Sequence, residues 1–358
     1  MSDDKYLVTL MQFLPFYSYK LALLLEYFGN AKKIWHADSK KLSAVGISSK
    51  VIGQFDKFRN NIEPQKYLNR LEVSGINWVT INDKNYPENM RGLKDFPLVL
   101  FYKGDLIRRD SESISIVGAR KSTSYGREVS YQIAGDLAQI GVTVISGMAR
   151  GIDSQAHLGA LDAGGRTIAV LTDLVKIYPP ENITLARKIM HNGCLMSEFP
   201  PGVAITQASF VWRNRIVSGL AKGVVVVEGE KKSGTLITAS FAADQGKPVF
   251  AIPGPINSPN SFAPNFLIQN GAKLTTGIGD ISDEVKFNSI SRKAGHDMEN
   301  NISSDEGIII KYISRESVHI DELARISGIT VKELSAKLTI MEMKGLVKNL
   351  GSGIYKKK

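Results

Sequence analysis

Cysteine is almost absent from this 358-residue sequence, and so are long hydrophobic runs. The one cysteine, Cys194, excludes a disulfide framework within the chain, and no His/Asn arrangement points to its activation, so we expect a buried, inert thiol. No apolar run approaches membrane-spanning length, and the amino terminus has no signal-peptide pattern. The sequence therefore predicts a cytoplasmic protein without membrane insertion.

Two nucleotide-binding signatures are missing as well. A complete Gly-x-Gly-x-x-Gly fingerprint with an acidic ribose-binding residue does not occur, which disfavours a nicotinamide cofactor. A Walker Gly-x-x-x-x-Gly-Lys-Ser/Thr loop is absent too, so the sequence lacks the lysine and the magnesium-binding hydroxyl of a nucleotide hydrolase. His157 has no second histidine or cysteine nearby at ligand spacing, which favours a hydrogen-bonded helical histidine over a metal ligand. We therefore expect no cofactor and no metal.

Basic residues, in contrast, are in excess. The chain has 45 Lys and Arg against 35 Asp and Glu, a net charge of +10 and a pI of about 9.4. Such a surplus favours polyanionic partners, nucleic acids among them. A hydrophobic content of 43% is enough to bury a sizeable core, divided between two or three domains.

The apolar spacing predicts a small helical domain followed by an α/β core. In residues 1–76 no convincing strand occurs, and one helical face, with Gly29 at its stop and Asn30 as a cap, is formed by Leu21, Leu24, Leu25 and Phe28. In residues 77–282, apolar β-branched runs alternate with helical segments, a pattern typical of a parallel α/β sheet. These runs include residues 167–171, 223–227 and 248–252.

The carboxyl-terminal part of the chain divides into a linker and a further unit. Residues 283–303 are rich in Ser, Asn, Asp and Lys and read as a linker. Residues 304–358 combine three short helices with a hairpin over residues 345–355, which predicts a winged helix with a Thr330–Glu333 capping box. The third helix carries Lys332 and Lys337 but also Glu333 and Glu342, so DNA readout, protein docking and a structural role all stay open. The helical positions are Ile308, Ile309 and Ile313, then Ile320, Leu323, Ala324 and Ile326, then Val331, Leu334, Leu338 and Met341.

Three glycine-bearing corners follow short apolar runs in the core. The runs are residues 114–117, 142–145 and 224–227, and the segments at these corners begin at Gly118, Ser146 and Ser233. Because parallel strands end at the same edge of a sheet, free backbone N–H groups at these corners are expected to bind an anion there. Asp153 is expected to cap the helix after the second corner. The predicted binding residues are Gly118, Arg120, Ser146, Gly147, Arg150, Ser233, Gly234 and Thr235, with Lys231 beside the third corner.

The segment 210–215, Phe-Val-Trp-Arg-Asn-Arg, concentrates aromatic rings and guanidinium groups. Guanidinium groups bind phosphate, an aromatic face stacks on an unstacked base, and an amide reaches a base edge, so the segment suits single-stranded nucleic acid. The predicted contacts are Phe210, Arg213, Asn214 and Arg215. The alternative interpretation makes Phe210 and Trp212 core residues and pairs the arginines with carboxylates such as Glu198 or Glu228.

Together these motifs resemble the DNA-processing protein A (DprA/Smf) family over residues 85–275. The resemblance implies a Rossmann-like core behind a helical domain similar to a sterile alpha motif and before a winged helix. It implies a non-enzymatic recombination mediator, dimeric through its Rossmann-like domain, that binds and protects incoming single-stranded DNA in natural transformation and helps to load RecA recombinase. The family's phosphate-binding arginine corresponds to Arg120, and its Phe-x-x-Arg-Asn-Arg motif to Phe210, Arg213 and Arg215. The matching segments are 86–87, 97–104, 116–120, 125–126, 146–157, 167–171, 178–179, 197–200, 210–220, 233–239, 251–254, 267–268 and 271–272.

Three departures from the family pattern stand out. Residues 172–176 replace a glycine-rich loop and are expected to alter one wall of the site. Ala263 stands where a glycine is common. Residues 14–17 lack the glycines of a helix-hairpin-helix turn, which argues against DNA contact through the helical domain.

Two alternative functions remain at this point. A nucleoside-monophosphate phosphoribohydrolase-like enzyme would need a glutamate in its Gly-Thr-x-x-Glu motif, and Thr238 occupies that position here. A nucleotide-sensing regulator would instead bind duplex DNA through the winged helix.

Overall fold

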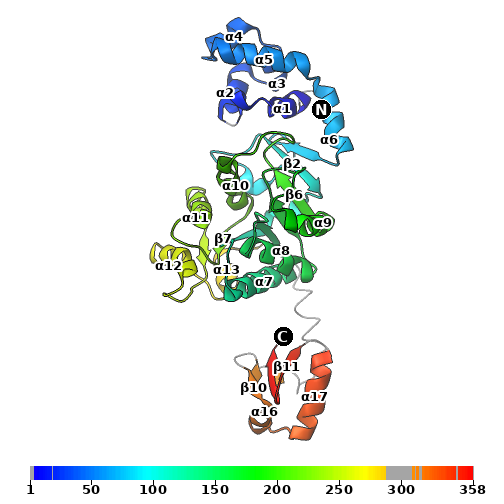
Figure 1. Ribbon diagram of the computed structural model, residues 1–358, viewed down its shortest axis with the longest axis vertical. Helices are drawn as coiled ribbons and strands as arrows, with labels where there is room; N and C mark the ends of the chain where they lie inside the picture. The colour runs from blue at the N-terminus through cyan, green and yellow to red at the C-terminus, as the bar shows by residue number, and fades with distance from the viewer. Residues whose placement is uncertain are drawn as a thin grey trace. The chain divides into compact units, whose positions relative to one another are not determined.

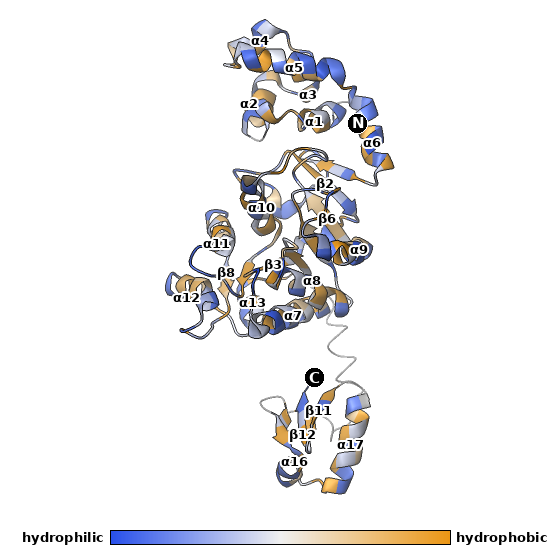
Figure 2. Ribbon diagram, viewed as in Figure 1, coloured by the Kyte–Doolittle hydropathy of each residue, from blue (hydrophilic) through white to orange (hydrophobic). Residues whose placement is uncertain are grey.

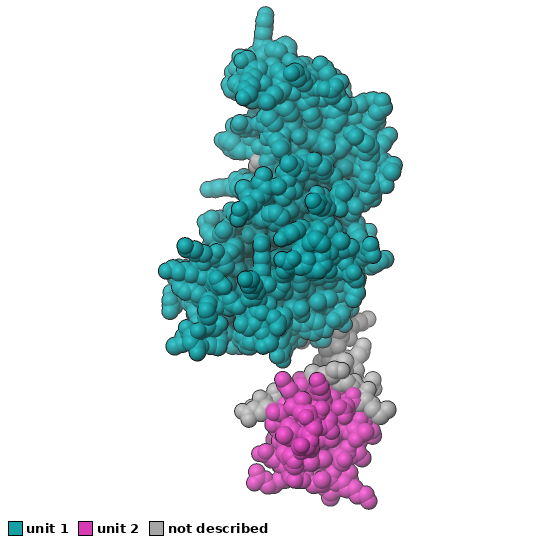
Figure 3. Space-filling model, in the orientation of Figure 1, with its two compact units in different colours: residues 1–290 teal, residues 291–358 magenta. Residues whose placement is uncertain are grey.

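The computed structural model describes residues 4–17, 19–287, 309–310, 312–313, 317–343 and 346–357. The chain forms two compact units, residues 1–290 and 291–358 (Figures 1 and 3). The expected linker lies outside the described residues from position 288 onward, and Ile308 does so too.

Short helices make up the start of the first unit. Helix α2 ends at Phe28, where Gly29 takes a positive φ of 84°, and the Asn30 side chain accepts the Lys33 N–H at 2.9 Å to cap α3. The predicted stop and cap are thus confirmed. The elements are α1 (Asp4–Leu10), η1 (Leu14–Phe16), α2 (Tyr19–Phe28), α3 (Ala31–Trp35), α4 (Ser39–Ala44), α5 (Ser49–Asn61) and α6 (Pro64–Val73).

A nine-stranded sheet in the order β1-β2-β6-β5-β4-β3-β7-β8-β9 forms the core of the first unit. All strands from β6 to β9 in this order pair in parallel, as predicted, but β2 runs antiparallel to both β1 and β6. The alternation of strands and helices in the sequence indicates parallel strands joined by crossover helices. An antiparallel neighbour needs no such helix, so the pattern could not reveal the direction of β2. The strands are β1 (Asn77–Thr80), β2 (Val99–Gly104), β3 (Ser113–Val117), β4 (Thr143–Ser146), β5 (Thr167–Val170), β6 (Gly193–Ser197), β7 (Val224–Val226), β8 (Val249–Ala251) and β9 (Lys273–Leu274).

Helices cover both faces of this sheet (Figures 1 and 2). Apolar residues of α7, α8 and α13 form one core cluster with alternate residues of β3, β4 and β7, such as Ile114, Val144 and Val225. The other residues of these strands, such as Val117 and Ile145, join a second cluster with α10 and α11. This alternation places α10 and α11 on the face opposite to α7 and α8. The remaining bounds are η2 (Glu88–Met90), η3 (Arg108–Ser111), α7 (Ser124–Gln139), α8 (Ile152–Asp162), η4 (Pro180–Asn182), α9 (Ile183–His191), α10 (Gln207–Leu220), α11 (Gly234–Asp244), η5 (Pro259–Ser261), α12 (Phe262–Gln269) and α13 (Ile278–Glu284).

The second unit has the predicted winged-helix elements in the residues that the structure describes. Helices α16 (Ile320–Ser327) and α17 (Val331–Met343) pack on a sheet of order β10-β12-β11, formed by β10 (Val318–His319), β11 (Val347–Gly351) and β12 (Ile354–Lys357). At the start of α17, the Glu333 N–H donates to the Thr330 hydroxyl at 3.4 Å, and that hydroxyl donates to the Glu333 carboxylate at 3.0 Å. The buried core includes Ile309, Ile313, Leu323, Leu334, Leu338, Met341 and Val347.

Candidate nucleic-acid interface

A groove of about 1050 Å³ lies at the carboxyl edge of the parallel strands. Strands β4, β3 and β7 are neighbours, so the corners that follow them meet there. This edge also contains the topological switch point, between β3 and β7, where the strand order reverses. Ligands commonly bind at such a point in open α/β folds. The predicted residues that line it are Gly118, Arg120, Gly147, Phe210, Arg213, Asn214, Ser233, Gly234 and Thr235.

Arg120 projects into this groove from the corner after β3. Its side chain is exposed and, within the described residues, forms no hydrogen bond or ion pair with protein groups. Gly118 keeps the corner close to helix α8, because a Cβ there would lie 2.6 Å from Cγ1 of Ile152. The corner therefore presents a guanidinium group that can move to meet an anionic ligand.

Arg213, from helix α10, is held in place instead. It is 6% exposed, and its Nη1 donates to the carbonyls of Gly147 at 2.8 Å and Val170 at 2.6 Å. Burial lowers the pKa of Arg213 to about 10; the carboxylate of Asp153 opposes this shift, and Arg120 adds to it. The guanidinium stays charged at neutral pH, and its position at the floor of the groove is fixed.

Asp153 faces Arg213 without capping the helix, contrary to expectation. Helix α8 begins at Ile152, and the cap position is Gly151, whose φ of 78° is positive. The Asp153 carboxylate accepts the Ala149 N–H at 3.2 Å. Burial raises the pKa of this carboxyl group, against the effect of the Arg213 charge.

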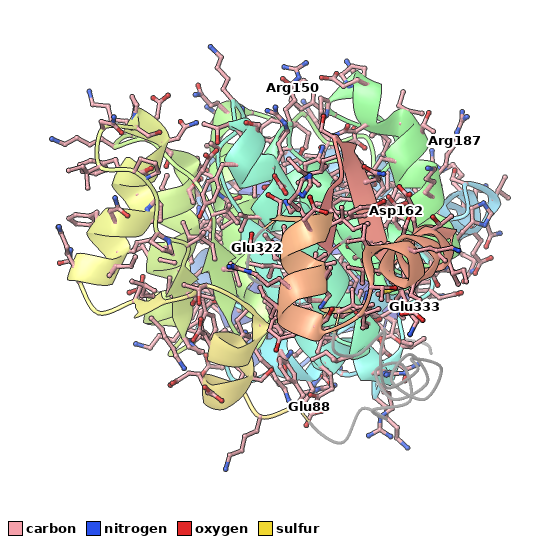
Figure 4. All side chains as sticks on the ribbon, turned by 90° about the horizontal axis from the view of Figure 1, so that it is seen from below. Glu88, Arg150, Asp162, Arg187, Glu322 and Glu333 are labelled. Atoms are coloured by element: carbon pink, nitrogen blue, oxygen red, sulfur yellow. The ribbon has the colours of Figure 1, made fainter. Side chains whose placement is uncertain are left out.

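Two aromatic rings form one side of the groove. The Phe210 and Tyr178 rings meet edge to face, with centroids 5.7 Å apart, and Tyr178 is 51% exposed. Next to them a small recess is lined by Arg150, Leu171 and Thr172. The Arg150 side chain, labelled in Figure 4, forms an ion pair with Glu181. These rings offer the apolar faces on which an unstacked base can lie.

The amino terminus of α11 forms another part of the groove. Ser233 precedes the helix, and its buried Oγ makes no hydrogen bond within the described residues. Asn214 contacts the same turn, with its Nδ2 3.5 Å from the carbonyl of Gly234. The first N–H groups of this helix are free to donate hydrogen bonds to an anion, and Lys232 lines the groove beside them.

Four predicted residues do not line the groove, and Arg150, which lines only the neighbouring recess, is one of them. Ser146 is buried and donates its hydroxyl to the Ile116 carbonyl at 2.6 Å. The Lys231 ammonium lies 5.8 Å from the centroid of the Phe262 ring.

Arg215 is the last of these residues. It is 2% exposed, and its Nη2 lies 2.5 Å from both carboxylate oxygens of Glu198. Its guanidinium also lies over the Trp212 ring, 4.4 Å from the centroid. For Arg215 the alternative interpretation, a pair with Glu198, is therefore confirmed, whereas Glu228 binds the Thr123 N–H at 2.9 Å instead.

Several groove residues escaped the sequence prediction. Lys121, Lys176, Tyr178 and Gln207 line the groove. Thr172, Asp173 and Lys176 belong to the segment that departs from the family pattern, so that departure does lie in the wall of the site. The Tyr-Pro pair at 178–179 was a signal for Tyr178, but only the fold places its ring against Phe210.

The buried histidine and cysteine are structural. His157 is fully buried, its Nδ1 lies 2.6 Å from Oγ1 of Thr167, and burial lowers its pKa to about 3. Cys194 is buried, and burial raises the pKa of its thiol. Among the described residues, no group of three or more His, Cys, Asp or Glu side chains could hold a metal ion. In that same part of the chain, no helix has the length and hydropathy needed to cross a membrane.

The groove and the winged helix define a nucleic-acid-binding class of α/β protein, and family comparisons specify it. The family model described as DNA recombination-mediator protein A matches residues 77–286, and that of the DprA winged helix domain matches residues 297–353. The chain belongs to the DNA-processing protein A (DprA/Smf) family.

Relatives and solved structures agree with this assignment. The chain is 42% identical over 213 residues to DNA processing protein DprA of Bacillus subtilis, covering 59% of this chain and 72% of that protein. It is 31% identical to Protein Smf of Synechocystis over 91% of this chain and 92% of that protein. The structure of DprA from Streptococcus pneumoniae matches with a TM-score of 0.65 and 34% identity, over 74% of this chain and 92% of that one. A Helicobacter pylori DprA structure, whose title describes a single-stranded DNA binding mode, matches with a TM-score of 0.50 and 29% identity, over 62% and 96%.

Proposed function

We propose that this protein is a single-stranded DNA-binding recombination mediator of natural transformation. The observation that carries the proposal is the combination, in one groove, of an exposed arginine, a fixed arginine and two aromatic rings: Arg120, Arg213, Phe210 and Tyr178. The DprA of Helicobacter pylori, which shares the fold, is described as binding single-stranded DNA.

The strand would cross the carboxyl edge of the sheet. Phosphates would lie against Arg120, against Arg213 and at the N–H groups that open α11, while a base would lie on the Phe210 ring. Contacts to phosphates and to the face of a base do not distinguish sequences, so binding should be largely independent of sequence.

Within the cell we propose a cytoplasmic role in which the protein protects incoming DNA and helps to load RecA recombinase, as a homodimer formed through the Rossmann-like domain. Exposed apolar groups at the far edge of the sheet support self-association. The rings of Phe262 and Phe266 on α12 stack with centroids 5.9 Å apart, and Leu274 on edge strand β9 is 49% exposed.

We propose that the protein acts without catalysis or a cofactor. The phosphoribohydrolase-like alternative needs a carboxylate at position 238, where the Thr238 hydroxyl donates to the Gly234 carbonyl at 3.2 Å within its own helix. A neutral hydroxyl engaged in this way cannot serve as a general acid or base at neutral pH.

Fluorescence anisotropy with labelled oligothymidine and a matched duplex tests the proposal. The wild type should bind the single strand more tightly, and Phe210→Leu should weaken that binding by about 1–3 kcal/mol if one base stacks on the ring. Tyr19→Leu is the matched control, because Tyr19 is 72% exposed on helix α2. Tighter binding to the duplex, or equal affinities for Phe210→Leu and the wild type, would contradict the proposed strand path.

A further inference from the structure

The hairpin of the second unit carries lysines directly opposite one another. Lys348 on β11 and Lys356 on β12 are register partners in the antiparallel pair, and both are exposed. Their neighbours Val347 and Tyr355 are buried, so the lysines lie on the outer face of the hairpin. Lys357, at the end of β12, is exposed as well. Like charges directly opposite each other destabilise a strand pair, so this arrangement works against the hairpin unless an anion offsets it.

Carboxylates of the described residues do not neutralise these lysines. Glu322 on α16 and Glu333 on α17, labelled in Figure 4, have partners close by in sequence. Glu322 lies 4.0 Å from Arg325 in its own helix, and Glu333 accepts the hydroxyl of Thr330, the residue before α17. Glu342 accepts the backbone N–H of Asn349 at 3.0 Å. Within the part of the unit that the structure describes, no ion pair involves Lys348 or Lys356.

We propose that this hairpin binds the phosphate backbone of duplex DNA, separately from the single strand held in the groove. Single strands bound without sequence preference usually stack on exposed rings, and the one aromatic residue of the hairpin, Tyr355, is 7% exposed. A lysine array without a stacking surface instead suits a backbone whose phosphates are already fixed in position. The tip, Gly351-Ser352-Gly353, consists of small residues with positive φ, which keeps it narrow.

The wing, and not helix α17, would make these phosphate contacts. The hairpin strands carry lysines without acidic residues, whereas α17 carries both signs, with Lys332 beside Glu333. The lysine-bearing face of the hairpin does not include Arg120 or Arg213. This proposal can therefore hold or fail independently of the proposed function.

Anisotropy on the full chain, with a labelled 20-base-pair duplex and labelled oligothymidine, tests the proposal. Lys348→Gln/Lys356→Gln should weaken duplex binding about 30-fold at 0.15 M salt and reduce the salt slope of log K by about 1.8, the effect of two lost phosphate contacts. Affinity for oligothymidine should stay within twofold. The matched control, Lys332→Gln/Lys337→Gln, removes the same charge from α17 and should leave duplex affinity within threefold.

Thermal denaturation separates a binding effect from a folding effect. The hairpin variant should keep or slightly raise its melting temperature, because it loses a like-charge pair. Three results would overturn the proposal: no measurable duplex binding by the wild type, equal losses in the hairpin and helix variants, or a loss of oligothymidine affinity as large as the loss for the duplex.

Discussion

Two arginines that look alike in the sequence should behave in opposite ways when they are replaced. Arg120 is exposed in the groove and makes no hydrogen bond or ion pair within the described residues. Arg215 is 2% exposed and paired with Glu198. We expect Arg120→Ala to weaken DNA binding with little change in stability, and Arg215→Met to reduce stability with no change in the DNA contacts of the folded protein.

The magnitudes follow from these environments. One lost single-strand phosphate contact reduces the salt slope by about 0.7, which corresponds to about a fourfold loss of affinity at 0.15 M salt and about eightfold at 0.05 M. Arg215→Met leaves the Glu198 carboxylate buried without its partner, and breaking a buried pair in this way costs about 3–5 kcal/mol. The double variant Arg215→Met/Glu198→Leu should recover most of that loss, because it also removes the stranded charge.

The assay combines urea denaturation with anisotropy titrations on oligothymidine at four or more salt concentrations, below the unfolding transition of each variant. An unchanged salt slope in Arg120→Ala would remove that residue from the strand path. A reduced slope in folded Arg215→Met would mean that Arg215 leaves Glu198 to contact DNA, and the structural role assigned to it here would be wrong.

Three further outcomes are expected. Gly147→Ala places a Cβ 2.8 Å from Cζ of Arg213, so it should weaken oligothymidine binding in anisotropy and cost about 1–3 kcal/mol in urea, whereas Gly53→Ala, with open space around it, should do neither. Lys247→Met leaves the carbonyls at the end of α10 without their ammonium donor and should lower the free energy of unfolding by about 2–4 kcal/mol in urea; a change below about 0.5 kcal/mol would mean that water replaces the lysine. His157 stays neutral when folded because burial lowers its pKa from 6.5 to about 3, so from pH 6.5 downward the wild type should lose about 1.4 kcal/mol per pH unit relative to His157→Gln, and parallel pH profiles would contradict this.

Much of the fold was predictable because local patterns and tertiary packing agree. The runs at 167–171, 223–227 and 248–252 contain β5, β7 and β8, and the spacing of Leu334, Leu338 and Met341 places them in the core of the winged helix. The antiparallel direction of β2 was not predicted, because it follows from pairing with β6 and no local sequence pattern encodes that pairing.

The site was predictable where backbone geometry decides it and less so where side chains choose partners. Neighbouring parallel strands end at the same edge of a sheet, so the glycine-bearing corners after β3, β4 and β7 were expected to lie together, and they line one groove. Whether Arg213 or Arg215 faces the groove depends on which side of α10 each occupies. It also depends on the carboxylate of Glu198, which follows strand β6 and pairs with Arg215 only in the folded chain. Asp153 does not cap α8, because the helix begins one residue before it, at Ile152, and its carboxylate accepts the Ala149 N–H of the preceding loop.

The contrast between Arg120 and Arg213 explains how one groove could hold a strand firmly without reading its sequence. The Nη1 of Arg213 is held by two backbone carbonyls, so binding a phosphate there requires little further loss of side-chain freedom. Arg120 has no such restraint and can follow phosphates at different positions. The fixed donor would set where the DNA backbone enters, the unrestrained donor would tolerate variation in its path, and any base could stack on the Phe210 ring. Such contacts would give orientation and affinity without distinguishing the bases, which is the combination that a recombination mediator needs.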